Sequence, residues 1–282
     1  MKLLEFEGKQ LFQKAGITIP KSLLIKSKND ITKIKVPCIL KAQVLSGKRG
    51  KVGLIKKFDK NERKAAQAFA KKIFNTKGVF SVLAEQLIPI KKEYYLSLMI
   101  NGIKKDITGI FCARGGMDIE DVAQKYPEEI IQFSLNESKK INVPEKKSII
   151  QLVKTLYLLM KTSDAELIEL NPLAVTSRGL VAVDAKVTID SKALYRHPEF
   201  QKYEHRELTG RELEAAHSGL HYVDLDGNVG IIGDGAGLVM ATMDTLVHYK
   251  LKPANFMDVG GGAGEERMVK ALQILQQKKL KC

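Results

Sequence analysis

Two consecutive segments near the end of the chain repeat the same order of structure, and this repeat limits the possible folds more than any other feature. "NVGIIGDGAGLVMATMDTLVHYK" and "PANFMDVGGGAGEERMVKALQILQQ" each read as a short apolar strand, a glycine-rich turn and an amphipathic helix. Strands that alternate with helices in this way pair in parallel, so the repeat predicts an α/β domain. The chain ends at "KKLKC", where a third strand would begin, and we therefore expect this domain to be incomplete.

The residues before this repeat mix helices and strands in another order, which predicts a separate α+β domain. Expected strands and hairpins cover residues 34–45, 54–55, 79–88, 92–113 and 167–187, and expected helices cover residues 3–15, 61–74 and 144–162. The first helix is expected to bury Leu4, Leu11, Phe12 and Ala15. Residues 199–218, rich in His, Arg and Glu, mark the expected junction, and we place the domains at 1–216 and 217–282.

Composition indicates a globular cytoplasmic enzyme. A chain of 282 residues, 44% of them hydrophobic, can bury a substantial core. No apolar run approaches the length of a membrane span, and the first residues lack the apolar segment of a signal peptide. Cys38, Cys112 and Cys282 have no spacing typical of disulfides or metal ligands, and the five histidines show no triad or zinc spacing.

The formal net charge of +14 raises the possibility of nucleic-acid binding, because Lys and Arg displace counterions from phosphates. The lysines, however, are spread over most of the chain, and no nucleic-acid module is recognisable. A lysine-rich proteome or growth at high temperature produces the same excess. We therefore predict no nucleic-acid partner. The charge could instead steer an anionic substrate or an acidic partner.

The hairpin "LIELNPLAVTSRGLVAVDAKV" places polar side chains where a buried hairpin should have none. Burying Glu169, Asn171, Asp184 and Lys186 costs free energy unless each finds a partner. Asn171 and Asp184 can project from the same face, since residues across a strand pair lie side by side. A carboxylate and an amide oxygen suit Mg²⁺, and Glu169 could join them. The alternative is a hairpin whose polar groups face solvent.

Lys41 lies in the middle of the apolar run "PCILKAQVL", so it needs an anionic partner. A nucleotide phosphate is one candidate, and a salt bridge to Glu85 or Glu93 is the other. The loop that follows, "GKRGK" at residues 47–51, combines glycines with cations, which suits phosphate binding. A solvated turn would have the same composition.

The glycine-rich turns at residues 235–237 and 260–262 precede helices, whose free N–H groups can bind anions. Tight turns also require glycine for purely geometric reasons.

Taken in order, these stretches resemble the β subunits of succinate–CoA ligases, which are ATP-grasp proteins. The resemblance covers residues 1–277 and is carried by "LLEFEGKQLFQKAGI", "LKAQVLSGKRGKVG", "LAEQLIPIKKEYYLSL", "GGMDIEDVA", "IELNPLAV" with "VDAKV", "ALYRHPEF" and the two glycine-rich repeats. It implies an ATP-grasp fold followed by a flavodoxin-like ligase domain. It also implies reversible, ADP-forming synthesis of succinyl-CoA with Mg²⁺ and ATP or ADP. The phosphorylated histidine is then expected on a CoA-binding α subunit.

The resemblance also implies roles for individual residues. The phosphoryl group is expected to pass to the partner, so no catalytic residue is expected in this chain, and its role is positioning and charge neutralisation. The implied nucleotide contacts are Lys41, Lys48, Arg49, Gly50, Glu85, Ile88 and Glu93, and the implied Mg²⁺ ligands are Asn171 and Asp184. Asp234 occupies the position of a family asparagine that contacts the substrate carboxylate.

The chain departs from the family pattern at several places. Lys48 replaces a glycine, which adds charge, and Arg114 replaces an acidic residue. Asp234 opposes a carboxylate substrate, because like charges repel unless one is protonated or bridged. The family's next strand, which leads to the phosphohistidine, does not follow in this sequence, so we expect either a further chain or a continuation of this one to supply it.

These departures leave two alternatives open. One is a truncated, non-catalytic paralogue that serves as a nucleotide-binding or assembly subunit. The other is a related acid–CoA ligase that acts on malate or citrate.

Overall fold

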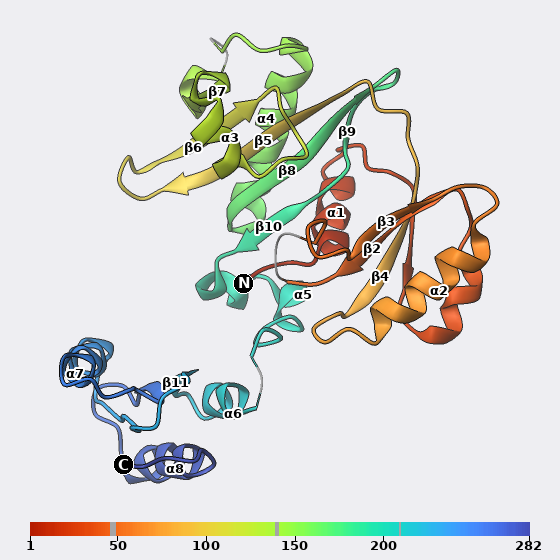
Figure 1. Ribbon diagram of the computed structural model, residues 1–282. Coiled ribbons are helices and arrows are strands. Elements are labelled where there is room, and N and C mark those ends of the chain that lie inside the picture. Colours follow the sequence, from red (N-terminus) through yellow and green to blue (C-terminus); the bar gives the residue numbers. More distant parts are fainter. Residues whose placement is uncertain (46–48, 139–140, 209) are drawn as a thin grey trace. The chain divides into compact units, whose positions relative to one another are not determined.

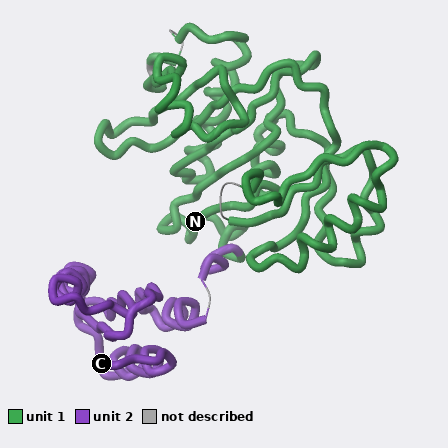
Figure 2. Tube along the Cα trace, viewed as in Figure 1, with its two compact units in different colours: residues 1–202 green, residues 203–282 purple. Residues whose placement is uncertain are grey.

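The computed structural model describes residues 1–45, 49–138, 141–208 and 210–282. The chain forms two compact units, Met1–Lys202 and Tyr203–Cys282 (Figure 2). The division falls within the expected junction at 199–218, but earlier than the boundary placed after residue 216. The boundary comes earlier because helix α6 (Arg211–His217) belongs to the second unit: its Ala215 packs in the core of that unit with Leu220 and Tyr222.

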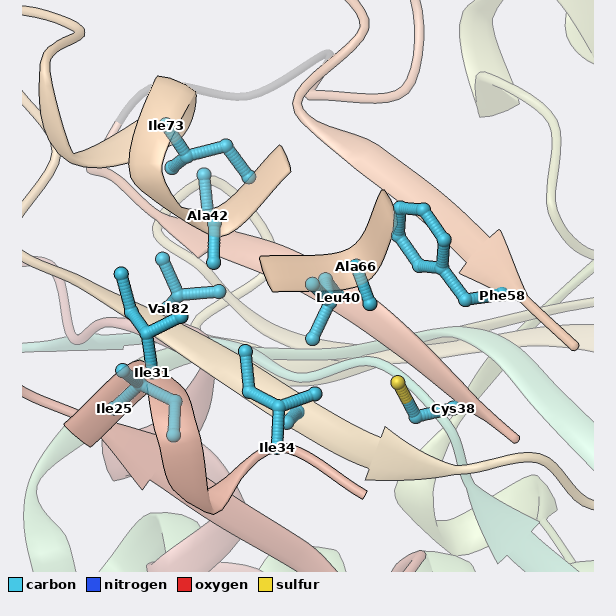
Figure 3. Close-up of a cluster of buried hydrophobic side chains, with 12 residues drawn as sticks. Ile25, Ile31, Ile34, Cys38, Leu40, Ala42, Phe58, Ala66, Ile73 and Val82 are labelled. Atoms are coloured by element: carbon cyan, nitrogen blue, oxygen red, sulfur yellow. The ribbon is translucent and has the colours of Figure 1, made fainter. Parts of the chain in front are cut away.

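The first sheet consists of antiparallel strands in the order β1-β4-β2-β3 (Figure 1). The strands are β1 (Ser22–Ile25), β2 (Cys38–Gln43), β3 (Ile55–Phe58) and β4 (Ser81–Gln86), and the 3₁₀ helix η1 spans Lys28–Lys33. Helix α2 (Arg63–Phe74) covers one face, because Ala66, Ala70 and Ile73 recur at the spacing of a buried helical stripe. Figure 3 shows the resulting core, in which side chains of α2 and η1 meet those of the strands.

The second sheet is also antiparallel, in the order β10-β8-β5-β6-β7, with β9 paired to the other end of β8 (Figure 1). Its strands are β5 (Lys92–Asn101), β6 (Asp106–Cys112), β7 (Ile130–Ser134), β8 (Ala165–Thr176), β9 (Gly179–Ala182) and β10 (Lys186–Ile189). The hairpins predicted at residues 92–113 and 167–187 are both confirmed.

Helix α4 (Lys146–Ser163) packs on this second sheet through a stripe that includes Ile149, Val153 and Leu156. Shorter helical segments complete the unit: α3 (Ile119–Lys125), η2 (Pro127–Glu129), η3 (Leu135–Glu137), η4 (Ser191–Arg196) and α5 (Pro198–Gln201). In the described ranges, no helix is both long and apolar enough to cross a membrane.

The second unit contains the predicted parallel pairing and adds an antiparallel strand that was not predicted. Strand β11 (His221–Asp224) pairs antiparallel with β12 (Asn255–Asp258). The predicted parallel pairing occurs as bridges from Val229 to Pro253 and from Gly233 to Asp258. Between them, the side chain of Asn255 bonds both backbone groups of Ile231, at 2.9 and 2.7 Å, so it replaces the ladder there. Helices α7 (Ala236–His248) and α8 (Glu265–Gln276) confirm the predicted helices.

Candidate functional site

Helix α1 (Glu5–Lys14) carries charged side chains on its buried face. The helix was predicted, but its buried residues are Glu5, Gly8, Lys9 and Phe12, spaced i, i+3, i+4 and i+7. Leu11 and Ala15, which were expected on this face, are only half-buried. The helix therefore directs Glu5 and Lys9 into the protein, where each needs a partner of opposite charge.

Contacts on both sides hold α1 between the two sheets of the first unit (Figure 1). The N–H of Phe6 donates to Gln43 Oε1 on β2 at 2.8 Å. The N–H of Leu3 donates to the carbonyl of Val187 on β10 at 3.0 Å. Gly8 lies against β10, where a Cβ would approach Val187 Cγ2 to 3.2 Å. The helix thus brings residues of both sheets to one place.

Lys41, at the centre of β2, is only 4% exposed and is surrounded by oxygen atoms. Its Nζ lies 2.8 Å from Glu5 Oε1, 2.6 Å from Glu85 Oε2 and 2.7 Å from the carbonyl of Val183. Burial alone would lower the pKa of Lys41, but the carboxylates of Glu5 and Glu85 outweigh it and raise the pKa. The salt bridge to Glu85, considered from the sequence, is therefore present.

Arg49 follows β2 and connects two carboxylates that come from distant parts of the chain. Its Nη1 lies 2.5 Å from Glu5 Oε2, and its Nη2 lies 2.9 Å from Asp184 Oδ1. Nη1 also donates to the carbonyl of Ala42 at 3.2 Å. Burial opposes the charged form, yet the attraction of Glu5 and Asp184 raises the pKa of Arg49. The guanidinium stays charged and fixed in place.

These contacts form one charged cluster, which we define as Glu5, Lys9, Lys41, Arg49, Glu85 and Asp184. Three cations face three carboxylates, so their formal charges cancel. The pKa of Glu5 lies well below its usual range, because the attraction of Lys41, Lys9 and Arg49 outweighs the opposing effect of burial. Sequence reasoning found four of the six residues and missed Glu5 and Lys9. Their i, i+4 spacing, beside Gly8 and Phe12, was the available signal.

Asn171 and Asp184 lie across from each other on the two segments of the predicted metal hairpin. Leu173 pairs with Ala182, and Glu169 pairs with Lys186, so the two candidate ligands lie midway between these pairs. The Asp184 carboxylate is 31% exposed and also accepts the N–H of Ala185 at 2.8 Å. The hairpin therefore brings together the two predicted ligands, while Glu169 Oε2 pairs with Lys186 Nζ at 3.1 Å.

The side chain of Asn171 also holds a neighbouring loop. Its Oδ1 accepts the N–H of Gly116 at 2.7 Å, and its Nδ2 donates to the carbonyl of Met117 at 2.8 Å. Gly116 has φ +75°, and a Cβ there would lie 2.8 Å from Glu93 Oε2. The exposed carboxylate of Glu93, at the start of β5, thus lies beside the loop that Asn171 holds.

The other predicted nucleotide contacts have varied environments. Glu85 is 1% exposed, and its carboxylate faces Lys9 and Lys41. Ile88 is half-buried just after β4, and Gly50 has open space around its α-carbon. Lys48 lies outside the described residues. After Gly50, Lys51 pairs with Asp118 and, at 3.4 Å, with Asp121, which connects this loop to the start of α3.

Arg114, where the sequence departs from the family pattern, has a local structural role. It donates two hydrogen bonds to the Glu129 carboxylate, both at 2.7 Å. Its guanidinium also lies 4.1 Å from the centre of the Tyr126 ring. These contacts connect the end of β6 to η2.

In the second unit, Asp258 connects the two glycine-rich turns. Its Oδ1 accepts the N–H groups of Gly235 and Gly260, both at 2.8 Å. The hydrogen bond from Gly260, together with that from Gly235, outweighs burial and lowers the pKa of Asp258. Asp234 is exposed next to Gly235. In the described residues, no group of three or more His, Cys, Asp or Glu is arranged to hold a metal ion.

The comparison of sequences identifies the family. The ATP-grasp domain family matches residues 2–175. The succinate–CoA ligase (ADP-forming) β subunit of Ignicoccus hospitalis is 39% identical over 98% of this chain and 78% of the relative. The protein of the same name from Methanocaldococcus jannaschii is 39% identical over 100% of this chain and 81% of the relative.

Solved structures share the fold at lower identity. The ATP citrate lyase of Methanothrix soehngenii, in complex with citrate and coenzyme A, matches with a TM-score of 0.71 at 17% identity. That match covers 98% of this chain and 76% of the lyase chain. Together with the sequence relatives, these matches establish that the chain has an ATP-grasp domain and belongs to the family of succinate–CoA ligase β subunits.

Proposed function

We propose that this chain is the nucleotide-binding β subunit of an ADP-forming succinate–CoA ligase. It binds ATP or ADP and supports phosphoryl transfer to a histidine on a CoA-binding α subunit. The names of the relatives from Ignicoccus hospitalis and Methanocaldococcus jannaschii support this activity. We place the nucleotide site in the first unit and the acid site in the second, where Asp234 lies beside a glycine-rich turn.

The single observation that carries the proposal is the contact between Arg49 and Asp184. It brings a cation from the predicted phosphate loop to a carboxylate of the predicted metal hairpin, at 2.9 Å. A nucleotide phosphate with its metal ion needs both kinds of group within one site. Lys41, bound to the same Glu5 as Arg49, adds a second cation.

The donor chemistry of the hairpin suits Mg²⁺. Asn171 Oδ1 and the Asp184 carboxylate are hard oxygen ligands, and each retains lone pairs beyond those used by its present partners. Asn171 and Asp184 would hold the ion, and the ion would neutralise charge on the phosphates when bound. Two protein ligands are enough, because Mg²⁺ commonly keeps water and phosphate in its other positions.

Within this site, the residues of the chain have distinct roles. Lys41 and Arg49 bind and orient phosphate oxygens, and Gly50 allows the backbone to approach them; we include Lys48 in the same loop. Because the Glu85 carboxylate faces Lys9 and Lys41, we propose that it orients Lys41. The backbone of residues 86–88 and the exposed Glu93 then contact the nucleoside.

Calorimetric titration of Mg·ATP into the purified chain tests the proposal, in salt sufficient to suppress nonspecific binding. We expect saturable one-site binding that is lost in Asp184→Ala and on removal of Mg²⁺ with EDTA. Glu166→Ala, which removes an exposed carboxylate near the start of β8 that has no role in the proposed site, is the matched control and should bind. Folded wild-type protein that does not bind, or an Asp184→Ala variant with full affinity, contradicts the proposal.

A further inference from the structure

Glu5 differs from the other carboxylates of the charged cluster in the number of cations that it contacts. Its Oε1 lies 2.6 Å from Lys9 Nζ and 2.8 Å from Lys41 Nζ. Its Oε2 lies 2.5 Å from Arg49 Nη1. Glu85 contacts the two lysines, and Asp184 contacts the arginine. Among the described residues of the cluster, Glu5 alone therefore contacts both the lysines and the arginine.

The location of Glu5 makes this connection rigid. It lies in the first turn of α1, and its side chain is only 1% exposed. The helix start is fixed by the Phe6 N–H, which donates to Gln43 on β2, the strand that carries Lys41. The carboxylate consequently has a fixed position relative to Lys41, and Arg49 is held against the same group.

We infer that Glu5 is a positioning residue of the nucleotide site, which holds Lys41 and Arg49 at a fixed separation so that both can bind phosphate oxygens. The inference rests on the proposed function. Glu5 does not itself contact the phosphates, since a carboxylate would repel them. Its contribution is preorganisation: two flexible cationic side chains are ordered before the ligand binds, which reduces the entropy lost on binding.

Glu5 has two opposite effects on phosphate binding, one through its negative charge and one through its positioning of Lys41 and Arg49. This opposition makes the inference testable. As a nearby anion, Glu5 weakens phosphate binding, so neutralising it should strengthen binding if charge alone matters. As a positioning group, it strengthens binding, so neutralising it should weaken binding. In Glu5→Gln the volume stays similar, but the amide NH₂ that replaces one oxygen cannot accept a hydrogen bond from a cation.

Titration of Mg·ADP into the full chain and its variants decides between these effects. We expect Glu5→Gln to raise the Kd at least tenfold. Lys9→Met removes a cation that contacts the same Glu5 Oε1 but leaves the contacts to Lys41 and Arg49, so we expect a much smaller rise. Glu214→Gln, which breaks the Glu214–Lys270 pair at 2.7 Å in the second unit, should match the wild type.

If the wild type binds normally and Glu5→Gln has an unchanged or lower Kd, the inference about Glu5 is wrong, while the proposed function stands. The same holds if Lys9→Met raises the Kd as much as Glu5→Gln, because a general loss of the cluster would then explain both. A wild-type protein that does not bind Mg·ADP overturns the proposed function and the inference with it. If Glu5→Gln does not fold, Glu5→Asp replaces it, since the shorter side chain cannot reach all three cations, and the same rise is expected.

Discussion

Arg49 and Asp184 are held together by one nitrogen, Nη2, which lies 2.9 Å from Oδ1 and 3.1 Å from Oδ2 of the carboxylate. The contact joins a loop of the first sheet to the hairpin of the second across 135 positions of sequence. The proposed phosphate-binding group thus neutralises the proposed metal ligand. In the proposed complex, a Mg·nucleotide would provide both with new partners, a phosphate for Arg49 and a cation for Asp184.

Replacing Arg49 by lysine should weaken nucleotide binding although the charge is kept. Lysine cannot present the planar fork with which Arg49 contacts Glu5 and Asp184 together. Hydrogen bonds to charged groups contribute about 1.5–3 kcal/mol, so we expect the Kd for Mg·ADP to rise roughly tenfold or more. Calorimetric titration measures this change. Arg63→Lys, at an exposed site where Arg63 bonds the Thr32 carbonyl, should bind normally.

Replacing Lys41 by methionine should destabilise the first unit as well as the nucleotide complex. The change leaves Glu5 and Glu85 buried with one partner fewer, and breaking a buried pair from one side costs about 3–5 kcal/mol. Urea denaturation followed by circular dichroism measures the loss. Lys33→Met removes an exposed pair with Asp30 and should cost less than about 1 kcal/mol. Equal losses in the two variants would show that burial does not govern the Lys41 pairs.

A glycine inside the second sheet provides a test of packing that is independent of the charged cluster. A Cβ at Gly109 on β6 would lie 2.3 Å from the ring of Phe133 on β7, so Gly109→Ala forces the strands or the ring to move. Overpacking of this kind costs typically about 1–3 kcal/mol. Gly102→Ala, in the turn between β5 and β6, meets no atom within 4 Å and is the control. Thermal unfolding of both variants should show a lower melting temperature for Gly109→Ala only.

Local sequence patterns predicted most of the first unit. Apolar alternation and the Asn101-Gly102 turn located the hairpins, and a helical stripe located α2 and α4. These signals lie within a few residues of one another. The buried face of α1 was misjudged for the opposite reason: Glu5 and Lys9 are buried only because Lys41, Arg49 and Glu85 arrive from β2, its loop and β4. No window of sequence around α1 contains those partners.

The same difference between local signals and distant partners explains which features of the second unit could be predicted. The strand–turn–helix pattern gave the helices and the parallel bridges, but β11 pairs with a strand more than thirty positions later in the chain. The buried amide of Asn255, which replaces ladder hydrogen bonds at Ile231, also has no local signature. Pairing between distant strands depends on tertiary contacts rather than on local periodicity.

The second unit should lose stability in acid because of Asp258. Hydrogen bonds from Gly260 and Gly235 lower its pKa in the folded state, so the carboxylate stabilises the fold above the pKa of an unfolded aspartate, about 3.9. That contribution disappears as the pH falls through the lower, folded value. Hydrogen exchange of peptides from residues 221–262, corrected for intrinsic rates, measures it between pH 6 and pH 3. Asp258→Asn should reduce this dependence, and the remainder is expected from Asp224, whose pKa Lys278 and Arg211 lower against the effect of burial. The exposed Asp226→Asn should preserve the full dependence.

Replacing Asp234 by asparagine should improve the use of a dicarboxylate substrate. Asp234 is exposed beside the turn that opens α7, where we propose that the acid binds, and its charge repels a substrate carboxylate. Two unit charges near contact in water interact by about 1 kcal/mol, so the KM for succinate should fall roughly fivefold. A coupled assay with a CoA-binding α subunit measures this change. Asp244→Asn, an exposed change farther along α7, should leave the KM unaltered. An unchanged KM in Asp234→Asn would place the acid away from this turn, and a higher KM would mean that the Asp234 carboxylate contributes to binding, through a proton or a bridging cation.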